Sequence, residues 1–144
     1  MPTYNHILVA VDLTEESGTV LEKATEIGSL CQAKLSLVHV LEPLGYAYGG
    51  DIPMDLTEVQ KQLDQHARER LTELGARANI STENLHVSIG RPETEVHRIA
   101  EETKADLIVV GSHGRHGFGL LLGSTANGVL HGAKCDVLAV RFRE

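Results

Sequence analysis

Five short segments rich in valine, isoleucine and leucine recur along the chain, and stretches with helical periodicity separate them. They span residues 6–12, 34–40, 85–89, 106–111 and 136–141, and this length and composition are typical of β-strands. Because a helical crossover joins each strand to the next, consecutive strands are expected to be parallel with right-handed connections. The sequence therefore predicts an α/β fold: a single open doubly wound five-stranded parallel sheet with helices on both faces.

The predicted strands differ in how continuously apolar they are. Segments 6–12 and 106–111 are almost wholly apolar, as strands covered on both faces must be, whereas 85–89 alternates and suits an edge. Doubly wound sheets bind ligands outside the carboxyl ends of the strands, where the winding reverses. We expect the first and fourth strands to flank that crevice, with Asp12 ending one strand and Gly111 ending the other.

Four helices are predicted between the strands, and the first three have apolar residues at helical spacing. The first is expected to follow Thr14 as N-cap, the third to begin at Pro92, and the short fourth to follow Ser124 as cap and end near Gly132. The second opens on a capping-box pair, Asp55 and Glu58. The apolar positions at helical spacing are Val20, Leu21, Ala24, Ile27 and Cys31 in the first helix, Leu56, Val59, Leu63, Ala67, Leu71, Leu74 and Ala78 in the second, and Val96, Ile99 and Ala100 in the third.

Composition narrows the function classes. The formal net charge is −7, so no basic field exists to concentrate nucleic acid or anionic lipid. No apolar stretch approaches the ~20 residues that span a bilayer, and the first residues lack the apolar core of a secretion signal. Two cysteines, Cys31 and Cys135, without zinc-binding spacing are typical of a reduced cytoplasmic protein with small buried thiols. At 144 residues the chain is expected to form one domain, 1–144.

The segment 111–125 leaves the fourth strand, passes five glycines and enters a helix at Ser124. Glycines let backbone N–H groups face a ligand, and a helix N-terminus adds unpaired donors and partial positive charge, which is the physical outline of a polyphosphate cradle. Residues 112–144 also carry a net charge of +2, from four basic and two acidic residues, in an otherwise acidic chain. The segment is neither a Walker A loop nor a GxGxxG fingerprint, and a flexible loop without a ligand is the alternative.

At these residues the chain resembles the universal stress protein family, over essentially its whole length. The family pattern is a glycine, two residues, a glycine, nine residues, then Gly-Ser or Gly-Thr, between a valine-rich strand and a helix. Gly111, Gly114 and Gly123-Ser124 match it, as do Asp12 and the turn Gly90-Arg-Pro92. One departure is that eight residues, not nine, separate Gly114 from Gly123.

The resemblance implies a Rossmann-like, non-catalytic module that binds ATP or ADP, with or without Mg²⁺, and acts in the stress response as a homodimer. Asp12 would lie near the ribose and the backbone around Val40 near the adenine, while the phosphate-binding residues would be Gly111, Gly114, Gly123, Ser124 and Thr125. Arg115 is a candidate to neutralise phosphate. The alternative function is a nucleotide-free dimeric interaction protein of the same fold, with protein partners that the sequence does not identify.

Several candidate residues have a purely structural interpretation as well. Asp12 could simply hold the turn that follows the first strand. The glycines could serve only the shape of the loop, without a ligand. Arg115 could be an ordinary solvated side chain. His113, His116 and His131 match no common metal-site spacing. We therefore expect ordinary polar histidines and no metal.

Enzyme classes of similar topology are disfavoured. A nucleotidyltransferase of this architecture would place an HxGH-type sequence after the first strand, where this chain has Leu13-Thr-Glu-Glu-Ser17. A phosphoacceptor receiver domain needs an acidic pair there and an aspartate ending the third strand, where this chain has Ile89-Gly90. No Ser-His-Asp or Cys-His arrangement is placed for nucleophilic catalysis. We therefore expect a binding module, not an enzyme.

The final apolar run is expected to form the interface between two copies of the chain. Residues Val137–Phe142 would leave an exposed strand edge, and such edges invite pairing. A two-fold axis would place this strand antiparallel to its copy, a contact that closes without forming fibres. Val140→Lys is expected to yield monomers.

Overall fold

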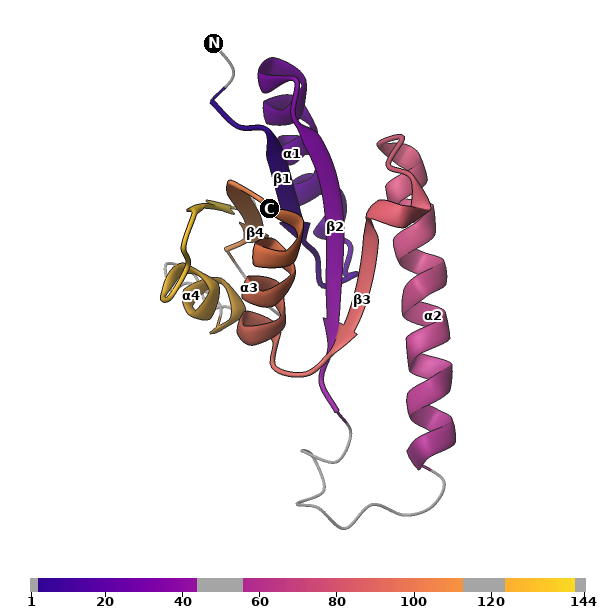
Figure 1. Cartoon of the computed structure of the whole chain (residues 1–144). Coiled ribbons are helices and arrows are strands. Elements are labelled where there is room, and N and C mark those ends of the chain that lie inside the picture. The colour runs from indigo at the N-terminus through magenta and orange to yellow at the C-terminus, as the bar shows by residue number, and fades with distance from the viewer. Residues whose placement is uncertain (1–2, 44–55, 113–123, 142–144) are drawn as a thin grey trace.

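The computed structural model describes residues 3–43, 56–112 and 124–141 and confirms the predicted fold class (Figure 1). Its five parallel strands lie in the order β3-β2-β1-β4-β5. In chain order the elements are β1 (His6–Ala10), α1 (Ser17–Cys31), β2 (Lys34–Leu41), α2 (Leu56–Arg77), a 3-10 turn (Thr82–Asn84), β3 (Leu85–Ile89), α3 (Pro92–Thr103), β4 (Leu107–Gly111), α4 (Ser124–Leu130) and β5 (Asp136–Val140).

The two most apolar strands occupy the middle of the sheet, as expected. Residues Ile7, Leu8 and Val9 of β1 are fully buried, and they alternate between two hydrophobic clusters. Ile7 and Val9 pack in the cluster that α1 and α2 cover, whereas Leu8 packs in the cluster under α3 and α4. Helices thus cover both faces (Figure 1), and β3, the alternating strand, lies at one edge.

Helix α1 begins later than the sequence predicts. Its first residue is Ser17 and its N-cap is Glu16, which makes no side-chain capping hydrogen bond. The hydroxyl and the amide of Thr14 both donate to Asp12 Oδ1, at 2.6 and 3.0 Å. Thr14 therefore belongs to the turn after β1, and the prediction that it caps α1 is wrong because Asp12 holds it outside the helix.

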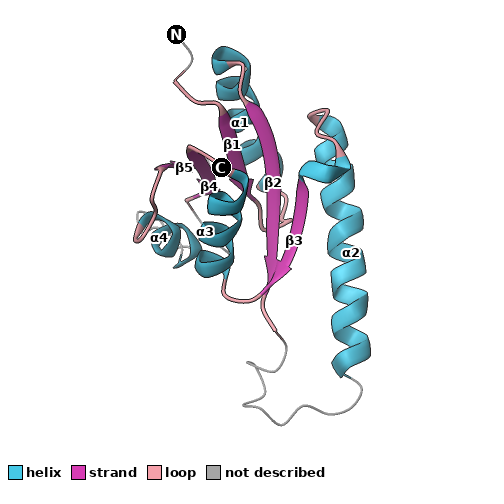
Figure 2. Ribbon diagram, viewed as in Figure 1, coloured by secondary structure: helices cyan, strands magenta, loops and turns pink. Residues whose placement is uncertain are grey.

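Helix α2 buries only part of its predicted stripe. Ala67, Leu71 and Leu74 are buried, but Val59 and Leu63 are each 40% exposed. In Figure 2 the N-terminal turns of α2 extend beyond the tips of β2 and β3. The periodicity therefore predicted the face of the helix correctly, but the sheet ends before that face does.

Four smaller expectations also need correction. Strand β1 ends at Ala10, so Asp12 lies two residues beyond it. Cys31 and Cys135 are free thiols and half-buried, not core residues. Ser124 is the first residue of α4 and not its cap. Val140 is only 7% exposed and packs in the core, so Val140→Lys would disrupt folding and would not test a dimer.

The start of α3 and its buried residues agree with the sequence prediction. Pro92 occupies the first turn, with Glu93 and Glu95 in the same turn, and Val96, Ile99 and Ala100 are buried. An acidic first turn is favourable beside the positive end of a helix dipole.

No helix in the described part of the chain is both long and apolar enough to cross a membrane.

Candidate functional site

The winding of the sheet reverses between β1 and β4. The strands on one side of β1 are β2 and β3, and those on the other side are β4 and β5. Ligands of doubly wound sheets bind at the carboxyl edge of this position. The predicted pair of strands, β1 and β4, therefore does flank the position where the winding reverses.

Three of the predicted site residues meet at this edge. Val9 pairs with Val109 and Ala10 pairs with Val38. Val40 and Gly111 lie two residues beyond these pairs in β2 and β4, and Asp12 lies two residues beyond Ala10 in the turn after β1. Asp12, Val40 and Gly111, which are up to 99 positions apart in the sequence, thus lie on neighbouring chain segments.

Asp12 holds the turn that follows β1. Its Oδ1 accepts hydrogen bonds from the Thr14 amide, the Thr14 hydroxyl and the buried Ser17 hydroxyl, the last at 3.1 Å. The structural interpretation of Asp12 is therefore correct. Within the described residues, no hydrogen bond occupies its Oδ2, so the same carboxylate retains an oxygen that can accept a bond from a ligand.

Two further polar residues stand at the carboxyl edge, and sequence analysis missed both. The ring of His39, near the end of β2, donates from Nδ1 to the Val11 carbonyl at 2.8 Å, since a carbonyl can only accept. Ser112 follows β4 and is 7% exposed; its amide donates to the Val140 carbonyl, and its hydroxyl has no partner among the described residues. A polar residue at the end of an otherwise apolar strand was the available signal for each.

The phosphate-binding half of the predicted site is described only in part. Gly114, Arg115 and Gly123 lie outside the described residues, as do His113 and His116. Ser124 and Thr125 are the first two residues of α4. The structure therefore brings together Asp12, Val40 and Gly111, and it leaves the contacts of the glycine loop untested.

A buried serine–histidine pair lies elsewhere, near the opposite edge of the sheet. His6 Nε2 is 2.7 Å from Ser36 Oγ, and His6 Nδ1 donates to the Thr103 carbonyl at 2.9 Å. Ser36 is 1% exposed and His6 is 8% exposed, so no substrate reaches the hydroxyl. The pair ties β1 to β2 and to the end of α3. Among the described residues, no group of three or more His, Cys, Asp or Glu side chains could hold a metal ion.

Comparison with known proteins agrees with the fold and with the family resemblance. The model of the Universal stress protein family matches residues 3–141. "Universal stress protein A homolog 2" of Coxiella burnetii is 45% identical over 147 residues, covering 99% of each chain. The solved structure of hypothetical protein MJ0577 is 22% identical, covers 98% of both chains and superposes with a TM-score of 0.81. A universal stress protein solved in complex with cAMP is 26% identical, covers 96% of this chain and 97% of its own, and has a TM-score of 0.67.

Proposed function

The chain belongs to the universal stress protein family, and from that premise we propose that it is a cytoplasmic, non-catalytic module that binds ATP or ADP and acts as a homodimer. The observation that carries the proposal is the meeting of Asp12, Val40 and Gly111 at the carboxyl edge of β1, β2 and β4. This is where parallel sheets bind nucleotides. The proposed nucleotide lies across that edge.

In the proposed complex Asp12 accepts hydrogen bonds from the ribose. Its Oδ1 is engaged by Thr14 and Ser17, which fixes the orientation of the carboxylate before a ligand arrives. Its Oδ2 is the remaining acceptor, and a ribose hydroxyl is a suitable donor. Structural and binding roles are then compatible in one side chain, because each uses a different oxygen.

The phosphates are proposed to lie over the glycine loop and the start of α4. Gly114, Gly123, Ser124 and Thr125 would supply backbone donors, and Arg115 would add a charge-assisted bond. The loop is one residue shorter than the family pattern. Gly117 and Gly119 provide two more positions that can adopt the backbone angles a shorter cradle requires.

The adenine base is proposed to pack against the backbone around Val40. The cAMP complex of a universal stress protein shows an adenine nucleotide bound to that relative, which supports an adenine site here and makes cAMP the natural competitor. Mg²⁺ would accompany the triphosphate. We propose binding without turnover, because the chain lacks the HxGH-type sequence and the acidic pair that enzyme classes of similar topology place after the first strand.

Native mass spectrometry of the protein purified without added nucleotide tests the proposal against the nucleotide-free alternative. We expect a mass increment of one ATP or ADP per chain, which is displaced by excess cAMP. If the protein carries no nucleotide, and still carries none after incubation with Mg²⁺ and millimolar ATP, the alternative function, a nucleotide-free interaction protein, would replace the proposal. Release of inorganic phosphate from bound ATP would overturn the non-catalytic part alone.

A further inference from the structure

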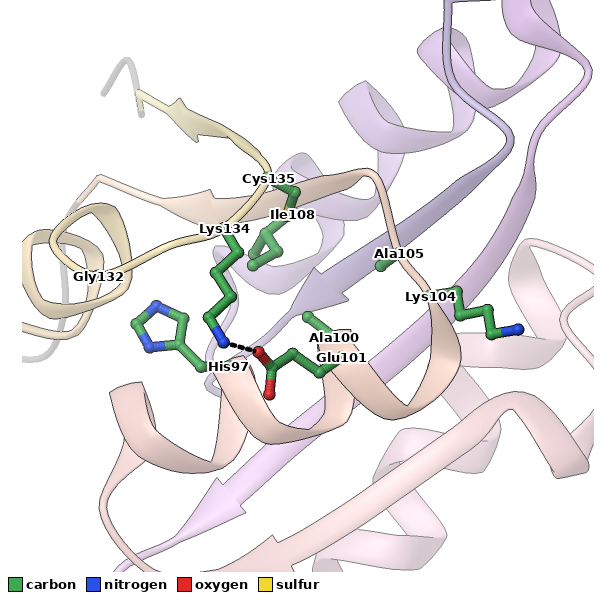
Figure 3. Close-up of a pocket in the computed structure, with 9 residues that line it drawn as sticks. All are labelled: His97, Ala100, Glu101, Lys104, Ala105, Ile108, Gly132, Lys134 and Cys135. Atoms are coloured by element: carbon green, nitrogen blue, oxygen red, sulfur yellow. Dashed lines mark ion pairs between the residues drawn. The ribbon is translucent and has the colours of Figure 1, made fainter.

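A pocket of about 370 Å³ lies between α3 and the segment that connects α4 to β5 (Figure 3). Its walls include Ala105, which precedes β4, Ile108 near the start of β4, and Cys135, which precedes β5. These residues mark the amino edge of the sheet, opposite the proposed nucleotide site. The pocket is therefore a separate feature, and its volume is within the range of small-molecule sites.

The inner wall of the pocket is apolar. Ala100 and Ile108 are buried core residues, and Ala105 and Cys135 pack against the same cluster. Burial, with smaller contributions from the carboxylates of Asp136 and Asp106, raises the pKa of the Cys135 thiol. The thiol is therefore uncharged at neutral pH and adds to the apolar wall. The space exists because three of these four side chains are small.

One end of the pocket is held rigid by His97. Its Nε2 donates to the Val129 carbonyl in the last turn of α4, at 2.8 Å. Gly132 has a φ of +88°, and a Cβ at that position would lie 3.5 Å from the His97 ring. The ring and the glycine backbone therefore both line this end of the pocket.

An ion pair crosses the mouth of the pocket. Lys134 Nζ lies 2.5 Å from a Glu101 carboxylate oxygen (Figure 3), and their side chains are 81% and 55% exposed. Exposed pairs of this kind contribute little free energy and exchange partners readily. Lys104 stands at the other side of the mouth with its ammonium turned away in Figure 3, and no described residue pairs with it. Lys134 is therefore the cation at the mouth, and Glu101 marks where a carboxylate is held against it.

We propose that this pocket binds a small carboxylate with an apolar body, such as a short-chain aliphatic or single-ring acid. The apolar body packs on Ala100, Ile108 and Cys135, and the carboxylate pairs with Lys134 in place of Glu101. An apolar wall with one exchangeable ammonium–carboxylate pair at its mouth suits such a monoanion better than a polyphosphate. The Lys134–Glu101 pair then acts as an internal competitor for the ligand.

Cys135 provides the readout for the test. In a Cys31→Ser background it is the one remaining cysteine of the chain, so its rate of reaction with N-ethylmaleimide at pH 8 reports whether the pocket is occupied. Sodium octanoate is the probe, and octanol is its uncharged counterpart. We expect octanoate to slow the reaction in a saturable way, at lower concentration than octanol.

The variants separate charge recognition from simple apolar binding. Lys134→Gln is expected to weaken octanoate binding about threefold and Glu101→Gln to strengthen it by a similar factor, as the loss or gain of one exposed ionic contact implies. Lys23→Gln, which breaks the exposed Lys23–Glu26 pair on α1, is the matched control and should change nothing. Each variant's reaction rate without octanoate is its own baseline.

Two outcomes would overturn the proposal. Equal protection by octanoate and octanol, unaffected by Lys134→Gln and Glu101→Gln, would mean an apolar crevice with no anion site. No protection at 10 mM octanoate, about the concentration at which a weak small-molecule complex forms, would mean that the pocket binds no such acid. The same measurement with saturating ATP should give the same octanoate affinity, because the two sites lie at opposite edges of the sheet.

Discussion

At the scale of single residues, two aspartates fix the chain at opposite edges of the sheet. Asp12 holds the turn at the carboxyl edge. Asp106 accepts bonds from the backbone amides of Asn5 and His6 at the amino edge. The position of Asp12 after a predicted strand was enough to predict that it holds the following turn or contacts a ligand. Asp106 was not singled out, because its partners lie about 100 residues away in the sequence.

Asp106→Asn tests the amino edge through pH. Burial acts to raise the pKa of Asp106, but the amides of His6 and Asn5 outweigh it and hold that pKa below its ordinary value. A depressed pKa contributes stability above the unfolded value, near 3.8, that is lost as pH falls through the folded value. We expect the substitution to lower the free energy of unfolding by about 1 kcal/mol at pH 7.

The difference in free energy of unfolding between the unmutated protein and Asp106→Asn should decrease when urea unfolding is repeated at pH values from 5 down to 3. Glu26→Gln, in an exposed pair on α1, is the matched control and should shift stability by less than about 0.5 kcal/mol. A gap that stays constant over this range would show that the charge of Asp106 is not what stabilises the edge.

Asp12→Asn and Asp12→Ala separate the two roles of Asp12. Asparagine keeps one oxygen for Thr14 and Ser17 but replaces the free oxygen with an NH₂ group, which cannot accept a bond from ribose. We expect Asp12→Asn to weaken ATP binding with little change in melting temperature. Asp12→Ala should weaken binding and also cost about 1–2 kcal/mol of stability, because the turn loses its acceptor. Equal ATP affinity in all three proteins would remove Asp12 from the proposed site.

At the scale of elements, each strand follows from local composition, whereas element ends depend on neighbours. Continuous apolarity in β1 and β4 reflects burial on two faces, so their central position was predictable. The start of α1 was not predictable, because it depends on which hydrogen bonds Asp12 accepts. The exposure of Val59 and Leu63 was not predictable either, because the periodicity of a helix does not show where the sheet beneath it ends.

The edge of β5 carries the proposed dimer contact, and its register identifies a cleaner test than Val140→Lys. The Ser112 amide donates to the Val140 carbonyl, so the backbone groups of Val140 face β4. Because these groups alternate along a strand, those of Val137 and Ala139 face the open edge. Ala139→Pro removes an outward N–H without breaking the bonds to β4.

We expect Ala139→Pro to sediment as a monomer in analytical ultracentrifugation while the unmutated chain sediments as a dimer. Ala139 is exposed, so its replacement leaves the core packing intact. Ala139→Val keeps the N–H and is the control that should remain dimeric. A dimeric Ala139→Pro protein with a normal melting temperature would place the interface elsewhere.

At the scale of the whole molecule, the two edges of one sheet carry two different candidate sites. The carboxyl edge was predictable, because strand order and a glycine motif both point to it. The pocket at the amino edge was not predictable. It arises because Ala100, Ala105 and Cys135 have small side chains where α3 lies beside the segment that connects α4 to β5. Each of these residues is unremarkable in the sequence, and only folding brings them together.

Calorimetric titration of the unmutated protein with ATP and Mg²⁺ tests the central proposal most directly. We predict one site per chain with micromolar affinity, about −8 kcal/mol. Gly114→Val and Gly123→Val should lose that heat while keeping the melting temperature of the ligand-free protein. No heat, together with no shift in melting temperature at millimolar ATP, would contradict the account and leave the nucleotide-free interaction protein in its place.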